Sequence, residues 1–148
     1  MRIIIAILFI MAVMLMSACN EPDCQSKTTN FVNVKFYKIE NNELDTLTIL
    51  SITAIAADDT VFVENLEVSS VRLPLRPDTT ATVFAFDSNF GRDTLILTYR
   101  KKARLISENC GVEVIFSDLG YSRNDFDSIK VVNQTLIEDI TEDVKIYN

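Results

Sequence analysis

The feature that most limits what this chain can fold into is an apolar run from Ile3 to Met16, which directly follows the positively charged Arg2. The run is shorter than the roughly 20 residues that a membrane-spanning helix needs. A cationic start, a short apolar segment and the small residues Ser17 and Ala18 are typical of a secretory signal. We therefore expect residues 1–18 to be cleaved off, with an uncleaved N-terminal helix as the alternative.

The residues Met16-Ser17-Ala18-Cys19 indicate which kind of signal this is. An ordinary signal-peptidase site has small residues both one and three positions before the cut, and Met16 is not small. A bacterial lipoprotein signal ends in an apolar residue, two small residues and a cysteine, which is the pattern here with methionine in place of leucine. We expect cleavage before Cys19 and acylation of its sulfur and new amino group. Two or more acyl chains hold a protein on a membrane far more firmly than one.

The other two cysteines, Cys24 and Cys110, would then lie in an oxidising envelope compartment, where disulfides persist. The sequence predicts a Cys24–Cys110 disulfide, to which the chain-entropy model assigns about 4.5 kcal/mol. Two free thiols are the alternative. A metal site is not expected, because the chain has no histidine and two cysteines do not complete a four-ligand zinc centre.

The chain is acidic, with 14 Lys and Arg against 21 Asp and Glu. This balance argues against nucleic acid or an anionic membrane face as a partner. It suits a domain that is tethered to a membrane without lying on it.

Beyond a polar tether at residues 19–30, residues 31–148 are predicted to form a single all-β domain. Short segments with alternating apolar residues, separated by turn residues, predict strands. The expected strands are 32–37, 46–56, 60–63, 68–75, 80–86, 94–99, 112–116, 129–136 and 144–147. Pro74 predicts a sheet edge or exit for its strand. This spacing favours an antiparallel β-sandwich, immunoglobulin-like or barrel-like.

Three connections carry further expectations. Residues 87–93 have the composition of a hairpin loop, and residues 118–125 are expected to close the preceding strand. Residues 135–144 are ambiguous. Apolar residues spaced by four and a capping box beginning at Thr135 allow a short helix, although strand, turn, strand is favoured.

Catalytic chemistry finds little support in the residues. Without histidine there is no Ser–His or Cys–His pair, so we predict that the protein is not an enzyme and needs no cofactor. Two carboxylate pairs, Asp125 with Asp127 and Asp58 with Asp59, remain available, but acids in turns are usually solvated.

Two further motifs, residues 87–93 and the basic cluster 100–104, each allow a binding function and an ordinary structural explanation. Residues 87–93 place oxygen ligands at alternate positions, as in a calcium loop, but Thr98 stands where a bidentate Glu is needed. The basic cluster 100–104, next to Tyr99, would suit an anionic head group or an acidic partner, and a solvated strand end is its commoner meaning.

An Asp followed by Thr or Ser and then an apolar residue or Thr recurs five times, more often than composition predicts. The motif resembles the acceptor of a general O-glycosylation system for exported proteins in some bacteria, and an Asp that closes a turn before a strand gives the same pattern. The candidate acceptors are Thr46, Thr60, Thr79, Thr94 and Ser128.

Several motifs occur in a recognisable order: Cys19 with Cys24, Val32-Asn33-Val34-Lys35-Phe36-Tyr37, Leu73-Pro74-Leu75, 93–99, Cys110-Gly111, 125–129 and Val131-Val132-Asn133. In this order they resemble an uncharacterised family of small lipoproteins of Gram-negative bacteria, known as a domain of unknown function. The resemblance covers nearly the whole chain after the signal. It implies an all-β lipoprotein with no assigned activity or catalytic residues.

The sequence therefore predicts an envelope lipoprotein, a non-catalytic interaction or structural module held by its lipid anchor, with an envelope protein as partner. Asn20 lacks the aspartate that commonly favours inner-membrane retention, so the outer membrane is expected rather than the inner one. The alternatives are a small-ligand-binding lipoprotein with a pocket in the β domain and an enzyme that uses carboxylates.

Overall fold

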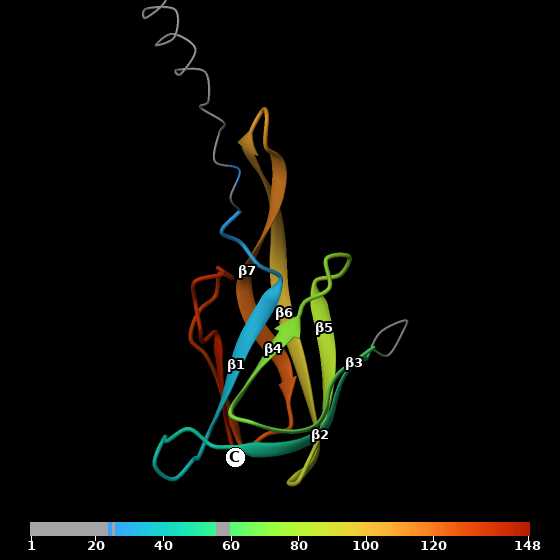
Figure 1. Ribbon diagram of the computed structural model, residues 1–148, viewed down its shortest axis with the longest axis vertical. Coiled ribbons are helices and arrows are strands. Elements are labelled where there is room, and N and C mark those ends of the chain that lie inside the picture. Colours follow the sequence, from blue (N-terminus) through green and yellow to red (C-terminus); the bar gives the residue numbers. More distant parts are fainter. Residues whose placement is uncertain (1–23, 25, 56–59) are drawn as a thin grey trace, which may run out of the picture.

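The computed structural model describes residues 24, 26–55 and 60–148, and they form an all-β domain of two packed sheets (Figure 1). The first sheet contains β1 (Phe31–Tyr37), β4 (Ser70–Pro74), β8 (Ser128–Val131) and β9 (Val144–Tyr147) in the order β4-β1-β9-β8. The second contains β2 (Leu47–Ile55), β3 (Thr60–Val68), β5 (Ala81–Ser88), β6 (Gly91–Ser107) and β7 (Gly111–Asn124) in the order β3-β2-β5-β6-β7. Neighbouring strands are antiparallel, except that β1 and β9 are parallel. The predicted all-β sandwich is confirmed.

Aromatic and aliphatic side chains from both sheets fill the space between them. Phe36 on β1 meets Phe86 on β5 edge to face, with ring centroids 6.5 Å apart, and Phe86 meets Phe126 at 5.2 Å. Phe36 and Phe86 have no exposed surface. The alternation that predicted β1 has its cause here, because Val32, Val34 and Phe36 all point into this core.

The chain passes from one sheet to the other at Ser69. β3 ends at Val68 and lies at one edge of the five-stranded sheet, while β4 begins at Ser70 and lies at one edge of the four-stranded sheet. The edge position predicted from Pro74 is confirmed. The predicted strand 68–75 was too long at its start, and 60–63 was too short, because Val68 still pairs with Leu47.

Strands β6 and β7 form a hairpin much longer than predicted, and its far half projects from the sandwich (Figure 1). We call this half, residues 101–116, the arm. β6 continues through the basic cluster, and β7 continues through Asp118, so the expected strand end at 100–104 and the expected turn at 118–125 were wrong. A β-bulge explains why a turn was expected at 118–125. Thr98 pairs with Gly120 and Arg100 with Ser117, so the two residues between them on β7, Asp118 and Leu119, face a single residue of β6.

Other predicted connections are also corrected. The β5–β6 loop is a two-residue turn at Asn89 and Phe90, because Ser88 pairs with Gly91, which has φ 131°. β8 ends at Val131 instead of residue 136, and 135–144 has no helix before β9 begins. Leu136 is buried there, and its N–H donates to the carbonyl of Phe116. Within the described ranges, no helix is long and apolar enough to cross a membrane.

Candidate functional site

The disulfide between Cys24 and Cys110 joins the N-terminal tether to the outer end of the arm. The Cα atoms of the two residues are 5.3 Å apart, and Cys110 lies in the turn between β6 and β7. The predicted pairing is therefore present. Gly111 follows with φ 80°, a left-handed backbone conformation that glycine adopts without strain. Cys19 and the rest of the predicted signal and cleavage site lie outside the described residues.

The tether follows β7 from the disulfide toward the body of the domain. The hydroxyl of Ser26 donates a 2.6 Å hydrogen bond to the carboxylate of Glu113, and the hydroxyl of Thr28 donates one of 3.3 Å to the same oxygen. Thr28 also forms an antiparallel bridge with Ile137. The carbonyl of Lys27 accepts a hydrogen bond from the N–H of Glu138. The predicted tether is thus attached to the domain over these residues.

Glu113 is the electrostatic centre of this attachment. Its side chain is 5 % exposed, and Arg104 on the paired strand donates to its other oxygen through Nε at 2.7 Å and through Nη2. The hydrogen bond from Ser26, followed by that from Arg104, holds the pKa of Glu113 below its ordinary value. A carboxylate in this position stays charged and keeps both strands and the tether together.

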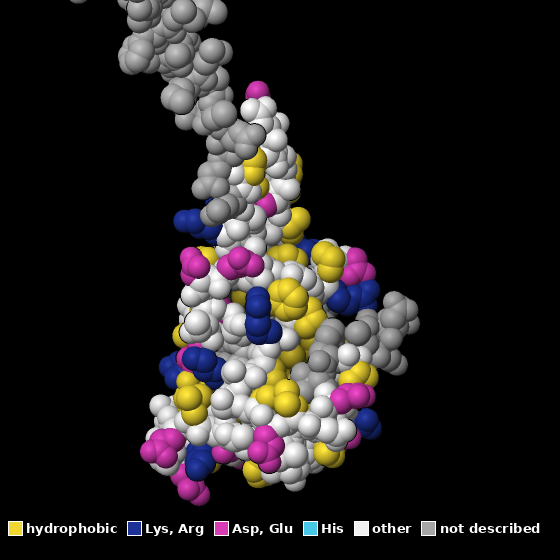
Figure 2. Space-filling view, in the orientation of Figure 1, with side chains coloured by type: hydrophobic (Ala, Val, Ile, Leu, Met, Phe, Trp, Pro, Cys, Tyr) yellow, Lys and Arg dark blue, Asp and Glu magenta, His cyan; other side chains and the backbone are white. Residues whose placement is uncertain are grey.

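The opposite face of the arm is apolar and exposed. Leu105 pairs with Val112, and Ala103 pairs with Val114, so these four side chains share one face. Leu105 is 61 % exposed, Val112 65 % and Val114 44 %. The arm therefore has one face covered by the tether and one face open, and a few hydrophobic side chains are visible on the projecting part in Figure 2.

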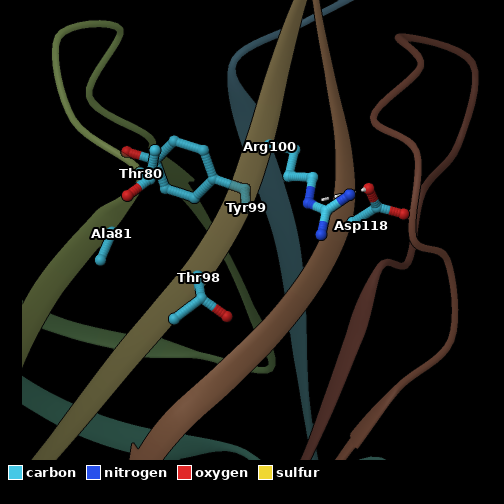
Figure 3. A pocket seen from close by; sticks show the side chains of 6 residues that line it. All are labelled: Thr80, Ala81, Thr98, Tyr99, Arg100 and Asp118. Atoms are coloured by element: carbon cyan, nitrogen blue, oxygen red, sulfur yellow. Dashed lines mark ion pairs between the residues drawn. The ribbon is translucent and has the colours of Figure 1, made fainter.

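A surface depression with a volume of about 610 Å³ lies at the base of the arm (Figure 3). It is lined by Thr80, Ala81, Thr98, Tyr99, Arg100 and Asp118. Tyr99 is buried, and its hydroxyl donates to the carbonyl of Arg76 at 2.7 Å and lies 2.8 Å from the hydroxyl of Thr82. Arg100 and Asp118 form an exposed ion pair with 3.7 Å between Nε and Oδ2. The two charged lining groups therefore bind each other, and the Tyr99 hydroxyl is bonded to residues beside the depression.

A second depression, of about 310 Å³, brings together acids at the end of the domain opposite the arm. Asp93, Asp125 and Asp127 line it with Phe90, Phe126 and Asn148. Burial raises the pKa of Asp93, and the charges of the other two acids add to this. Arg123 donates to both oxygens of Asp125, whose pKa is lowered chiefly by that contact. Among the described residues, no group of three or more acids or cysteines is placed to hold a metal ion.

Of the two carboxylate pairs considered for catalysis, only one lies among the described residues. Asp125 and Asp127 share a depression, while Asp58 and Asp59 lie outside the described residues. Residues 87–93 belong mostly to β5 and β6, around a turn too short to wrap an ion.

The five candidate glycosylation residues occupy unlike environments. Thr46 and Ser128 are exposed, one just before β2 and one at the start of β8. Thr79 is half-buried, and its hydroxyl donates to the carbonyl of Ala81 at 2.7 Å. Thr94 lies half-buried on the outer face of the five-stranded sheet, where it borders a shallow depression with Thr53 and Ala85. Thr60 begins β3, and its side chain is not among those described.

Sequence reasoning missed the cluster formed by Ser26, Arg104 and Glu113. Glu113 occupies the polar position of an alternating strand, where an exposed side chain is the ordinary expectation. The hydroxyl that covers it lies 87 residues away in the sequence. No local signal identifies such a partner. The predicted disulfide was the one available indication that the tether returns to this part of the chain.

Comparisons with known proteins add one finding. No curated protein and no solved structure matches the chain. A family model described as a family of unknown function (DUF6452) matches residues 46–148, which include β2 to β9. The match begins after Cys19, Cys24 and β1, so it concerns the β domain and leaves the anchor to other tests. Since the matched part is well over half of the sequence, the chain belongs to the family of unknown function DUF6452.

Proposed function

We propose that this protein is a lipid-anchored, non-catalytic interaction module of the bacterial cell envelope, held on the outer membrane through Cys19. The observation that carries the proposal is the Cys24–Cys110 disulfide, which attaches the chain five residues after Cys19 to the end of a projecting arm. A flexible tether serves to keep a domain near a membrane. A tether fastened along an arm also sets the orientation in which the domain is presented.

The filled interior favours binding of a partner at the protein surface over binding of a small ligand in an enclosed pocket. The space between the sheets is occupied by fully buried side chains, including Phe36, Phe84 and Phe86. In the depression at the base of the arm, the two charged lining groups, Arg100 and Asp118, already form an ion pair with each other. A small ligand normally needs a concave, largely apolar site with a few unused polar groups.

The anchor is tested first, by intact mass of the protein extracted from membranes, before and after reduction. We expect a chain that begins at Cys19, carries acyl chains and gains two hydrogens on reduction. A Cys19→Ser variant should keep its signal uncleaved and carry no acyl chains. A full-length mass without lipid would remove the anchor from the proposal.

The interaction is tested by cross-linking in living cells at native expression level, followed by mass spectrometry. We expect a reproducible envelope protein that is lost in Cys19→Ser. The double variant Cys24→Ser and Cys110→Ser keeps the lipid and loses the disulfide. The yield of the cross-linked partner should fall in this variant, while membrane attachment persists. If no protein is captured above the Cys19→Ser background, the interaction role is wrong.

A further inference from the structure

We propose that the apolar face of the arm lies on the membrane that holds the anchor, with Ala103, Leu105, Val112 and Val114 in contact with lipid. This inference rests on the proposed lipid anchor and adds a second point of contact to it. The occupant of the face is thereby a lipid surface, and not a second copy of the chain or another protein.

The first argument is the shape of the arm. Its two strands pair with each other beyond the sandwich, and its outer part, residues 102–115, contributes no side chain to the hydrophobic core, in which Phe116 at its base is packed (Figure 1). The face that carries Glu113 is covered by the tether, while the face that carries Leu105 and Val112 has no cover among the described residues. Exposed apolar side chains gathered on one face of a projecting element are typical of an interaction surface.

The second argument is reach. Residues 19–24 span at most about 18 Å when fully extended. The disulfide fixes the end of this span at Cys110, and Val112 is two residues further along β7. An acylated Cys19 therefore keeps the apolar face within about 30 Å of its own lipid, even when every intervening residue is stretched. The outer end of the arm is thus held close to the anchor.

The third argument is charge. On the apolar face, the exposed pairs of β6 and β7 are Ala103 with Val114 and Leu105 with Val112, and none is acidic. Asp93, Asp125 and Asp127 gather at the other end of the domain, and the exposed Glu108 lies in the turn at the tip of the arm, outside these pairs. The acidic composition, which argues against the whole domain lying on a membrane, is compatible with contact through the arm alone.

The contact is expected to depend on the anchor. Side chains in the membrane interface are buried only about 5–10 Å deep, and a few of them bind weakly on their own. A covalent tether turns this weak contact into an intramolecular one by raising its effective concentration. The arm should therefore touch lipid in the acylated protein, and an unacylated protein that lacks residues 1–18 and carries Cys19→Ser should not bind vesicles.

The absence of tryptophan from the sequence allows a direct test. Val112→Trp and Leu105→Trp each place a fluorescent probe on the apolar face. Phe90→Trp is the matched control, because Phe90 is 63 % exposed, like Val112, and lies beyond the opposite end of β6. At about 3.3 Å per residue, the 15 positions from Phe90 to Leu105 separate the control from the probes on the apolar face by as much as about 50 Å.

Each acylated variant is reconstituted into phosphatidylglycerol and phosphatidylethanolamine vesicles, with or without brominated acyl chains. For the probes at 112 and 105 we expect blue-shifted emission and roughly twofold quenching by the brominated lipid, since interfacial side chains reach the acyl boundary. The probe at 90 should show neither. Removing the disulfide in Val112→Trp should reduce the quenching while the protein stays on the vesicles.

Two results would overturn the inference and leave the anchor standing. One is equal, weak quenching at 112, 105 and 90 in protein whose mass shows the acyl chains. The other is a blue shift at 112 without quenching by brominated lipid, which indicates that protein, such as a second copy, covers the face. If the extracted protein carries no acyl chains and does not float with vesicles, both this inference and the proposed function fail.

Discussion

The hydroxyl of Ser26 donates a 2.6 Å hydrogen bond to the carboxylate of Glu113, although 87 positions separate the two residues in the sequence. Together with the disulfide, this contact makes the tether a third component of the β6–β7 arm. The polar contact and the covalent bond have different sensitivities, since one responds to pH and the other to reducing agents.

We predict that Glu113→Gln loosens the tether. The neutral amide loses the ion pair with Arg104, and its NH2 group cannot accept a hydrogen bond from Ser26. Trypsin should then cleave after Lys27 at least about tenfold faster, as expected when a hydrogen bond to a charged group is lost. The matched control is Glu108→Gln, at an exposed residue of the arm, which should be cleaved at the wild-type rate. Equal rates for both variants would contradict the role given to Glu113.

The attachment should also weaken in acid. Because the folded protein holds the pKa of Glu113 below its ordinary value of 4.5, this group stabilises the fold fully above that value. The contribution is lost as the pH falls from 4.5 through the lowered pKa. Hydrogen exchange of the tether amides, corrected for its intrinsic pH dependence, should rise over that range in the wild type and change less in Glu113→Gln.

Removal of the disulfide is expected to lower the free energy of unfolding by about 2–4 kcal/mol, less than the full loop-entropy value. The reason is that the bond joins two peripheral segments, so the folded protein also gains freedom when it is broken. Urea unfolding of the soluble domain with Cys24→Ser and Cys110→Ser measures this change. A loss of folding altogether would show that the arm and tether are needed for the sandwich itself.

Asp143 should make stability depend on pH in the opposite direction to Glu113. Its side chain is 1 % exposed, its Oδ2 accepts hydrogen bonds from the backbone and side chain of Asn33, and its Oδ1 has no partner among the described residues. Burial raises its pKa above the ordinary 3.8, although the bonds from Asn33 act in the other direction. A raised carboxyl pKa stabilises the folded state below the unfolded value and loses that contribution as the pH rises through the folded one.

Asp143→Asn should therefore become more stable relative to the wild type as the pH rises from about 4, and the difference should level off once the wild-type carboxyl has ionised. Urea unfolding of both proteins at a series of pH values measures the two slopes. Parallel curves would mean that Asp143 ionises in the folded protein as it does in the unfolded chain.

Phe86→Ala is predicted to cost about 3–5 kcal/mol of stability, because it removes a fully buried ring that contacts Phe36 and Phe126 from both sides. Phe90→Ala, at the exposed turn of the same hairpin, should stay within about 0.5 kcal/mol of the wild type. Thermal or urea unfolding distinguishes the two. Similar losses for both would contradict the core assignment.

O-glycosylation remains a prediction, and the structure ranks its candidate sites. Exposed Thr46 and Ser128 have room for a sugar, whereas the hydroxyl of Thr79 is half-buried and bonded to the carbonyl of Ala81. Intact mass of protein from its natural host should show a hexose increment that Thr46→Val or Ser128→Ala reduces and Thr79→Val does not. The bare chain mass, or a sugar on Thr79, would contradict this.

The sandwich was predictable where strands have one buried face. Val32, Val34 and Phe36 alternate with polar residues because each is fully buried, and the same holds for Leu95 and Leu97 on β6. The disulfide followed from compartment and cysteine number alone. Such signals are local, and a sequence displays them directly.

The arm was not predictable in the same way. Beyond Tyr99, β6 leaves the sandwich, so Lys102, Ala103 and Arg104 are all exposed and no alternation records the strand. On β7, Asp118 and Gly120 have the composition of a turn, but Asp118 adopts φ 52° within a bulge and the strand continues. Pairing between β6 and β7 holds the arm together. The alternation of apolar and polar residues in either strand alone does not reveal that pairing.

The parallel pairing of β1 with β9 has a consequence for the order of events in biosynthesis. β1 is among the first residues of the domain to emerge from the ribosome, and its neighbour in the sheet spans Val144–Tyr147, among the last. The four-stranded sheet therefore cannot close on a nascent chain. Contacts of such long sequence separation also slow the final step. A chain truncated before Val144 should stay unfolded and open to proteases, however well its first strands are made.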